Sequence, residues 1–166
     1  MVALQRFLNA LVIFIISGVI LAAFGVQIFE GEEPCPLCYL QRAGMIGVAF
    51  ALALNLKYGI RPQHYGLALL FTLLGGTVAL RQISLHVCPQ FPKFGLPVLG
   101  MSLYTWSFFV FVCSVLAVAL LLMLYRKEHE EVPVEKWSLI AIGLIFFVTV
   151  ANVLSTLVQC GFGSCE

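Results

Sequence analysis

The sequence predicts an all-α, polytopic membrane protein: five transmembrane helices that form a single membrane domain over residues 1–166. One observation behind this prediction is composition, since 61% of the 166 residues are hydrophobic and only 10% are charged. About a quarter of the residues of a soluble domain are charged. The other observation is that the apolar residues gather into five long runs, and a helix needs roughly 20 apolar residues to cross a bilayer. A soluble globular domain is thereby excluded, and the lipid bilayer is the expected surrounding.

The first two helices are expected over about residues 7–29 and 38–56. The first run is longer than the apolar region of a cleaved signal peptide, so we interpret it as a retained helix. The second run carries Gln41 and Arg42 in its first turns. Because an arginine at membrane depth is costly, the outer end of this helix must face something polar.

The other three helices are expected over about residues 65–85, 98–124 and 137–158. The third run ends in polar residues, including Gln82 and His86. The fourth and fifth are apolar and long enough to span the membrane. The connecting segments are too short to hold a soluble domain, so the helices make up the whole predicted structure.

Positive charge in the short loops predicts the orientation, because Lys and Arg are retained on the cytoplasmic side. Six basic residues fall on one side of the predicted membrane: Arg6, Lys57, Arg61, Arg126, Lys127 and Lys136. The opposite side holds the acidic residues Glu30, Glu32 and Glu33 and the C-terminal Glu166. We therefore expect a cytoplasmic N-terminus and a periplasmic C-terminus in a bacterial inner membrane. With a net charge of +1, the chain offers no basic surface for nucleic acid.

Six cysteines are distributed unevenly over this topology. Five fall on the outer face, where disulfides form and persist: Cys35, Cys38, Cys88, Cys160 and Cys165. Cys113 lies inside the fourth run and is expected to be an inert buried thiol. The outer five are the candidate catalytic cysteines. Because five is an odd number, at least one of them must be free or take part in a transient mixed disulfide.

The Cys35-Pro-Leu-Cys38 segment has the spacing of a reversible, redox-active disulfide. The cysteine nearer the helix start gains thiolate character from the exposed backbone amides there, and this is Cys38. Arg42 lies four residues on, so a helix places its guanidinium on the same face as that sulfur, where a cation lowers the pKa of a thiol. The alternatives are a structural disulfide or half of a metal knuckle. The sequence has no second knuckle to complete four thiolates, so no metal site is predicted.

Gln82 and His86 share one helical face at the outer end of the third run. Together with Arg42 they are expected to line a polar notch that opens into the hydrocarbon. Their hydrogen-bond donors suit the carbonyl oxygens of a lipid-soluble quinone, while the surrounding aliphatic side chains suit its ring and tail. The alternative is that these residues only solvate the end of the helix near the headgroups.

The segment from Cys35 to Arg42, CPLCYLQR, resembles the Cys-x-x-Cys-x-x-x-Arg signature of the disulfide bond formation protein B family of quinone-coupled thiol oxidases. The stretch from Arg81 and Gln82 to His86 is similar to the polar end of that family's third helix. The resemblance extends over about residues 7–124. It implies an enzyme that reoxidises a periplasmic thioredoxin-like thiol oxidase and passes electrons to ubiquinone or menaquinone.

Two features depart from that family. Members usually carry a second cysteine pair in the loop between helices three and four, whereas this loop holds only Cys88. They also usually stop after four helices, whereas a fifth helix here brings Cys160 and Cys165 to the outer face. The relay disulfide is therefore expected to join Cys88 to a tail cysteine or to join the two tail cysteines to each other, and both pairings stay open.

On this interpretation the relay disulfide accepts electrons from the partner protein, and exchange then reduces the pair formed by Cys35 and Cys38. The Cys38 thiolate, beside Arg42, passes the electrons to the quinone. Two other classes of function compete with the enzyme. One is a membrane protein whose outer cysteines bind a soft metal such as copper(I) or zinc, and the other is a structural subunit held together by disulfides.

Overall fold

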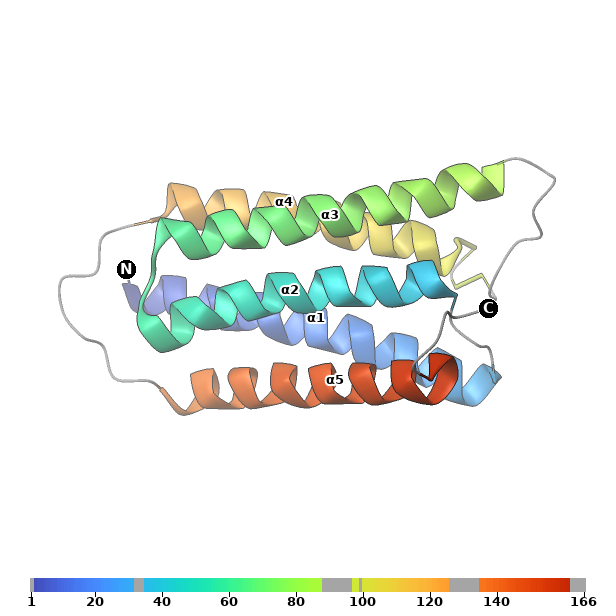
Figure 1. The fold of residues 1–166 in the computed structure, drawn as a ribbon. Helices are drawn as coiled ribbons and strands as arrows, with labels where there is room; N and C mark the ends of the chain where they lie inside the picture. The colour runs from blue at the N-terminus through green and yellow to red at the C-terminus, as the bar shows by residue number, and fades with distance from the viewer. Residues whose placement is uncertain (1, 32–34, 88–96, 99, 126–134, 162–166) are drawn as a thin grey trace.

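A computed structural model describes residues 2–31, 35–87, 97–98, 100–125 and 135–161, and it consists of five helices (Figure 1). Each helix is long and apolar enough to cross a membrane. In chain order the helices are α1 Val2–Glu30, α2 Pro36–Tyr58, α3 Pro62–Val87, α4 Leu103–Met123 and α5 Lys136–Cys160. The all-α fold class with five candidate spans is thus confirmed, and the described residues form no strand. The orientation of the termini across the membrane stays a prediction.

The start of α4 lies after the predicted boundary, because a tight turn occupies the residues before it. Val98 and Met101 exchange two backbone hydrogen bonds, and Gly100 between them has a φ of +79°. Glycine adopts such a φ without steric cost. The chain therefore turns here and enters the helix only at Leu103, five residues later than the apolar pattern indicates.

Helix α2 lies at the centre of the bundle (Figure 1) and packs against the other four helices. Within its apolar stretch 61% of the residues are buried, against 33% or less in each of the other helices. Helix α5 packs on α1 and α2, whereas α4 packs chiefly on α3. Because successive helices alternate in direction, the end of α1, the start of α2 and the end of α3 meet at one end of the bundle, with the end of α5. We call it the cysteine end, because Cys35, Cys38 and Cys160 lie there.

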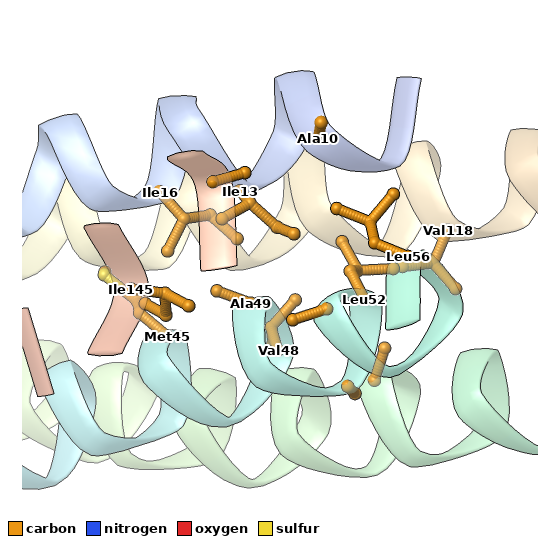
Figure 2. Close-up of a cluster of buried hydrophobic side chains, with 14 of the residues drawn as sticks. Ala10, Ile13, Ile16, Met45, Val48, Ala49, Leu52, Leu56, Val118 and Ile145 are labelled. Atoms are coloured by element: carbon orange, nitrogen blue, oxygen red, sulfur yellow. The ribbon is translucent and has the colours of Figure 1, made fainter. Parts of the chain in front are cut away.

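The middle of the bundle is closed by aliphatic side chains from α1, α2, α4 and α5 (Figure 2). The residues labelled in this cluster are Ala10, Ile13, Ile16, Met45, Val48, Ala49, Leu52, Leu56, Val118 and Ile145. The alanine side chains of this cluster are short, which lets neighbouring helices approach closely. Its β-branched side chains are stiff, which favours one packing arrangement.

Glycines set the close approach of α2 to α3. A Cβ on Gly44 would stand 3.0 Å from the Cα of Gly75, and a Cβ on Gly75 would stand 2.2 Å from Cζ of Phe111. The Phe111 ring of α4 is buried and fills the space that the two glycines leave. Small residues at helix crossings serve this purpose in membranes, where packing rather than exclusion of water joins helices.

A group of buried polar side chains joins α1, α2 and α3 at the end opposite the cysteines. Asn9 donates to the Tyr65 hydroxyl at 2.8 Å and accepts from Asn55 at 3.1 Å. Arg6 donates to the backbone carbonyl of Leu56 at 2.8 Å, one of the carbonyls that the last turn of α2 leaves without a helical partner. These bonds fix α1, α2 and α3 relative to one another at the end opposite the cysteines, and they thereby help to position α2 along the bundle.

We predict that Gly75→Ala lowers the thermal stability of the protein in detergent, because the new methyl group must displace the buried Phe111 ring. Overpacking of this kind costs about 1–3 kcal/mol. The matched control is Gly76→Ala, since a Cβ there meets only Phe111 Cβ at an ordinary 3.7 Å. The control is expected to be neutral or to stabilise by up to about 1 kcal/mol through helix propensity. Equal melting temperatures for the two variants would contradict the close packing of the Phe111 ring on Gly75.

Candidate functional site

The predicted cysteine pair lies at the first turn of α2. Cys35 is the N-cap residue and Pro36 opens the helix, a position where the missing N–H of proline costs nothing. The Cys38 backbone N–H donates to the Cys35 carbonyl at 2.9 Å and to the Cys35 sulfur at 3.3 Å. The helix start thus brings the two sulfur atoms within 2.6 Å of each other. Both cysteines are half-buried free thiols.

Gln82 of α3 holds the pair from the side. Its Nε2 donates to the sulfur of Cys35 at 3.2 Å and to that of Cys38 at 3.7 Å, while its Oε1 accepts from Gln41 at 2.6 Å. Both glutamines are buried. Because these contacts use both donors of the Gln82 amide, the amide N–H groups of this side chain bond to the two sulfurs. Gln41 was noted in the sequence only as a polar residue near the helix start, and its role depends on α3 packing against it.

The low-pKa thiol of the pair is Cys35. The hydrogen bond from the Cys38 thiol is the main cause that lowers the pKa of Cys35 to about 6, with help from the Cys38 backbone amide and from Gln82 and against the effect of burial. A donor to a thiolate stabilises the charged form. The sequence interpretation placed the thiolate on Cys38 and is corrected here, because the Cys38 thiol and backbone amide donate to the N-cap sulfur. The Gln82 amide also lies closer to this sulfur, at 3.2 Å, than to that of Cys38, at 3.7 Å.

Arg42 is buried and turns toward α1. It donates to Gln27 Oε1 at 2.9 Å and to the Ala23 carbonyl at 3.2 Å. Its guanidinium lies 4.6 Å from the centre of the Phe24 ring and 5.8 Å from that of Tyr39. The predicted grouping of Arg42 with the polar residues of α3 is thus divided by α2, with Arg42 on the α1 side and Gln82 on the α3 side.

His86 lies one turn after Gln82 and joins α3 to α4. Its Nδ1 bonds to the Gln82 carbonyl at 2.8 Å, and its ring stacks on Tyr104 with centroids 4.8 Å apart. A carbonyl oxygen only accepts, so Nδ1 carries the proton and the neutral ring has an acceptor at Nε2. The one N–H of the neutral ring is thus used by the Gln82 carbonyl, so neutral His86 has no donor left for a second carbonyl oxygen.

Helix α5 contributes residues that the sequence did not single out. The Tyr39 hydroxyl donates to Gln159 Oε1 and lies 3.3 Å from the Ser155 hydroxyl. Gln27 donates its Nε2 to the same hydroxyl at 3.2 Å. The available signal was that Ser155 and Gln159 are polar, lie four residues apart and follow an otherwise apolar run, so they share a face.

The remaining cysteines are only partly described. Cys160, the last residue of α5, is disulfide-bonded. Cys88 and Cys165 lie outside the described residues, so the relay pairing stays a prediction. Cys113 is exposed on α4, not buried as expected, because its face of α4 points away from the bundle. In the described part of the chain, no three His, Cys, Asp or Glu residues gather as a metal site would require.

A comparison with known proteins agrees with this geometry. A model of the family described as "Disulfide bond formation protein DsbB" matches residues 5–93, more than half of the chain. The chain belongs to this family. The matched segment holds most of α1 and all of α2 and α3, with the cysteine pair, Arg42, Gln82 and His86. It therefore covers the described site except for Tyr104 of α4 and the residues of α5.

Curated relatives of this family extend the comparison. A disulfide bond formation protein B of Ralstonia nicotianae is 31% identical over 161 residues, which cover 78% of this chain and 100% of that protein. The relatives from Marinobacter nauticus and Cupriavidus pinatubonensis are 36% and 35% identical. The chain aligns with 58% and 50% of the lengths of these two proteins. No solved structure matches the chain.

We predict that Gln82→Leu raises the pKa of Cys35 above its value of about 6, because a leucine cannot donate to the thiolate. The thiolate exists above its pKa, so the wild-type thiol reacts well at pH 7 and loses reactivity as the pH falls through 6. In the variant this loss should occur at a higher pH. The rate of iodoacetamide modification of Cys35 in the reduced protein, read by mass spectrometry, measures the midpoint.

The control for this measurement is Ser84→Ala, on the same helix. The Ser84 hydroxyl is exposed, and in the part of the chain that the structure describes it bonds only to the Arg81 carbonyl of its own helix. Its removal should leave the midpoint unchanged. An unchanged midpoint in Gln82→Leu as well would show that the amide of Gln82 does not stabilise the thiolate.

Proposed function

We propose that this member of the disulfide bond formation protein B family is a quinone-dependent thiol oxidase of a bacterial inner membrane. It reoxidises a periplasmic thioredoxin-like disulfide donor and delivers the electrons to ubiquinone or menaquinone. The observation that carries the proposal is the pair of Cys35 and Cys38, with sulfurs 2.6 Å apart and a pKa of about 6 at Cys35. A thiolate beside a thiol at an exposed helix start is suited to thiol–disulfide exchange.

The residues of the pair account for the chemistry of exchange. A thiolate of an incoming dithiol attacks the disulfide of Cys35 and Cys38. A second exchange then releases that dithiol in its disulfide form and leaves both cysteines reduced. At neutral pH Cys35 then holds a thiolate and Cys38 a thiol. Closing the disulfide again removes two electrons from the two sulfurs and the proton from Cys38. Gln82 and the Cys38 amide stabilise the charge on Cys35 until that step.

A bound quinone supplies the acceptor for these two electrons. The residues present fit such a group on the α1 side of α2. Two hydrogen bonds to described residues use two of the five N–H groups of Arg42, which leaves donors for a carbonyl oxygen. The Phe24 and Tyr39 rings beside the guanidinium provide an apolar face. Arg42 is therefore the residue proposed to hold the quinone head group.

Gln82 and His86 take other roles in this proposal. Gln82 has both amide hydrogens on the sulfurs, so it tunes the thiol pair. His86 holds the end of α3 against α4 through Tyr104 and presents Nε2 as an acceptor, which suits it to receive a proton. The quinone site is thus proposed around Arg42, with the two α3 residues beside the sulfurs.

Cys160 belongs to the proposed relay that passes electrons from the partner to the pair. Its disulfide stands at the end of α5, beside the Tyr39 and Gln159 contact and therefore at the cysteine end of the bundle. A disulfide at this end can exchange with a protein partner and then with the pair of Cys35 and Cys38. Cys88 and Cys165 are the proposed relay partners.

We predict that Cys35→Ser and Cys38→Ser each abolish the oxidation of dithiothreitol by a short-chain ubiquinone, because one sulfur cannot form the disulfide. Cys113→Ala should retain near wild-type turnover, because its thiol lies on the outward face of α4. The decay of ubiquinone absorbance in purified protein measures the rate. More than a few per cent of activity in either serine variant would refute the proposed terminal pair.

We also predict that Cys160→Ser blocks oxidation of a reduced thioredoxin-like disulfide donor but spares oxidation of dithiothreitol, because a small dithiol needs no relay. The single substitution is cleaner than removal of the tail, since it keeps the bond between Tyr39 and Gln159. The two substrates are compared in parallel on one preparation. Unchanged rates with the protein substrate would mean that Cys160 is structural.

A further inference from the structure

Ser155 of α5 stands where the polar contacts of three helices meet. Its hydroxyl accepts from Gln27 of α1 at 3.2 Å and lies 3.3 Å from the hydroxyl of Tyr39 of α2. The Tyr39 hydroxyl also donates to Gln159, one turn further along α5. One face of α5 therefore holds two side chains that come from other helices.

Both of those side chains also hold Arg42. Gln27 accepts from the guanidinium through Oε1 at 2.9 Å, and the Tyr39 ring lies 5.8 Å from the guanidinium carbon. The path from α5 to Arg42 is therefore short, and each of its steps is a hydrogen bond or a ring contact. No direct contact between Ser155 and Arg42 is needed.

The amide of Gln27 can bond to both Arg42 and Ser155 in only one orientation. Arginine has only donors, so Gln27 must present its oxygen to Arg42 and its nitrogen to the other side. The Ser155 hydroxyl is the acceptor that receives this nitrogen. Without it the amide loses the bond that keeps Oε1 toward the guanidinium. Ser155 thereby helps to hold Gln27 in the orientation that Arg42 requires.

We propose that Ser155 is a positioning residue for the quinone site: through Gln27 and Tyr39 it fixes the Arg42 guanidinium for an incoming quinone carbonyl. This inference rests on the proposed function, in which Arg42 holds the head group. Helix α5 lies outside the segment matched by the family model, so nothing in the family match assigns it such a part. The fifth helix is then a component of the quinone site as well as a carrier of Cys160.

The test compares wild-type protein with Ser155→Ala, with Ser155→Thr, which restores the hydroxyl, and with Thr156→Ala as the control. Among the described residues, the Thr156 hydroxyl bonds only within α5, to the Asn152 carbonyl at 2.8 Å. Two quantities are measured with a short-chain ubiquinone. One is the KM and kcat of dithiothreitol oxidation, and the other is the equilibrium Kd of the oxidised protein, obtained by dialysis.

Ser155→Ala should raise both KM and Kd about fivefold, the factor that one net hydrogen bond contributes, and leave kcat within about twofold. Thr at this position should restore most of the affinity, and Thr156→Ala should match wild type. In the Gln27→Ala background the Ser155→Ala change should have a smaller effect than in wild type, since only the path through Tyr39 then remains. If Ser155→Ala does not fold, Tyr39→Phe removes the other hydroxyl of the cluster, keeps the ring and should raise Kd.

The outcomes separate this inference from the proposed function. A wild-type protein that oxidises dithiothreitol, with Ser155→Ala equal to it in KM and Kd, overturns the positioning role and leaves the thiol oxidase intact. A wild-type protein that binds the quinone more tightly than Ser155→Ala does, but does not oxidise dithiol, overturns the oxidase and leaves the positioning role. A wild-type protein that binds no quinone overturns both.

Discussion

The constraint on which this structure depends is that a polar side chain buried within an apolar bundle is costly unless it has a hydrogen-bond partner, and key partners here come from other helices. In hydrocarbon the alternative is an unpaired polar group, which costs several kcal/mol in the limit of no compensation. The chain meets this constraint at both ends of its central helix. Asn55 bonds to Asn9 at one end, and Gln41 bonds to Gln82 at the other. These pairs decide which helices face each other, because aliphatic packing in lipid has little preference of its own.

The same constraint divides the site into two halves with different chemistry. On the α3 side, amide hydrogens converge on two sulfurs and favour a thiolate at Cys35. On the α1 side, Arg42 is held between Gln27, the Ala23 carbonyl and two aromatic rings. A redox dithiol and a permanent cation thus stand on opposite flanks of one helix turn. The proposed transfer of electrons takes place across that turn, with exchange and quinone binding kept to separate surfaces.

Helix α5 shows how an added element can be joined to an existing bundle. Its outward face is apolar, and its inward face ends in Ser155 and Gln159, which bond to residues of α1 and α2. The helix therefore reaches the site through side chains that α1 and α2 already direct toward Arg42. It also carries Cys160 to the same end of the bundle, so the proposed relay and the proposed quinone site share one structural support.

The sequence by itself determined the five helices and the cysteine pair, because hydrophobic runs of spanning length and a Cys-x-x-Cys spacing are local properties of the chain. It also placed Arg42, Gln82 and His86 near the correct end. It could not decide which thiol is the more acidic, nor that Arg42 turns to α1 while Gln82 turns to the sulfurs. The part played by Ser155 was equally hidden. These features depend on contacts between residues far apart in the chain, such as Gln27 with Ser155 and Gln82 with Cys35, and only the packing of α1, α3 and α5 around α2 creates them.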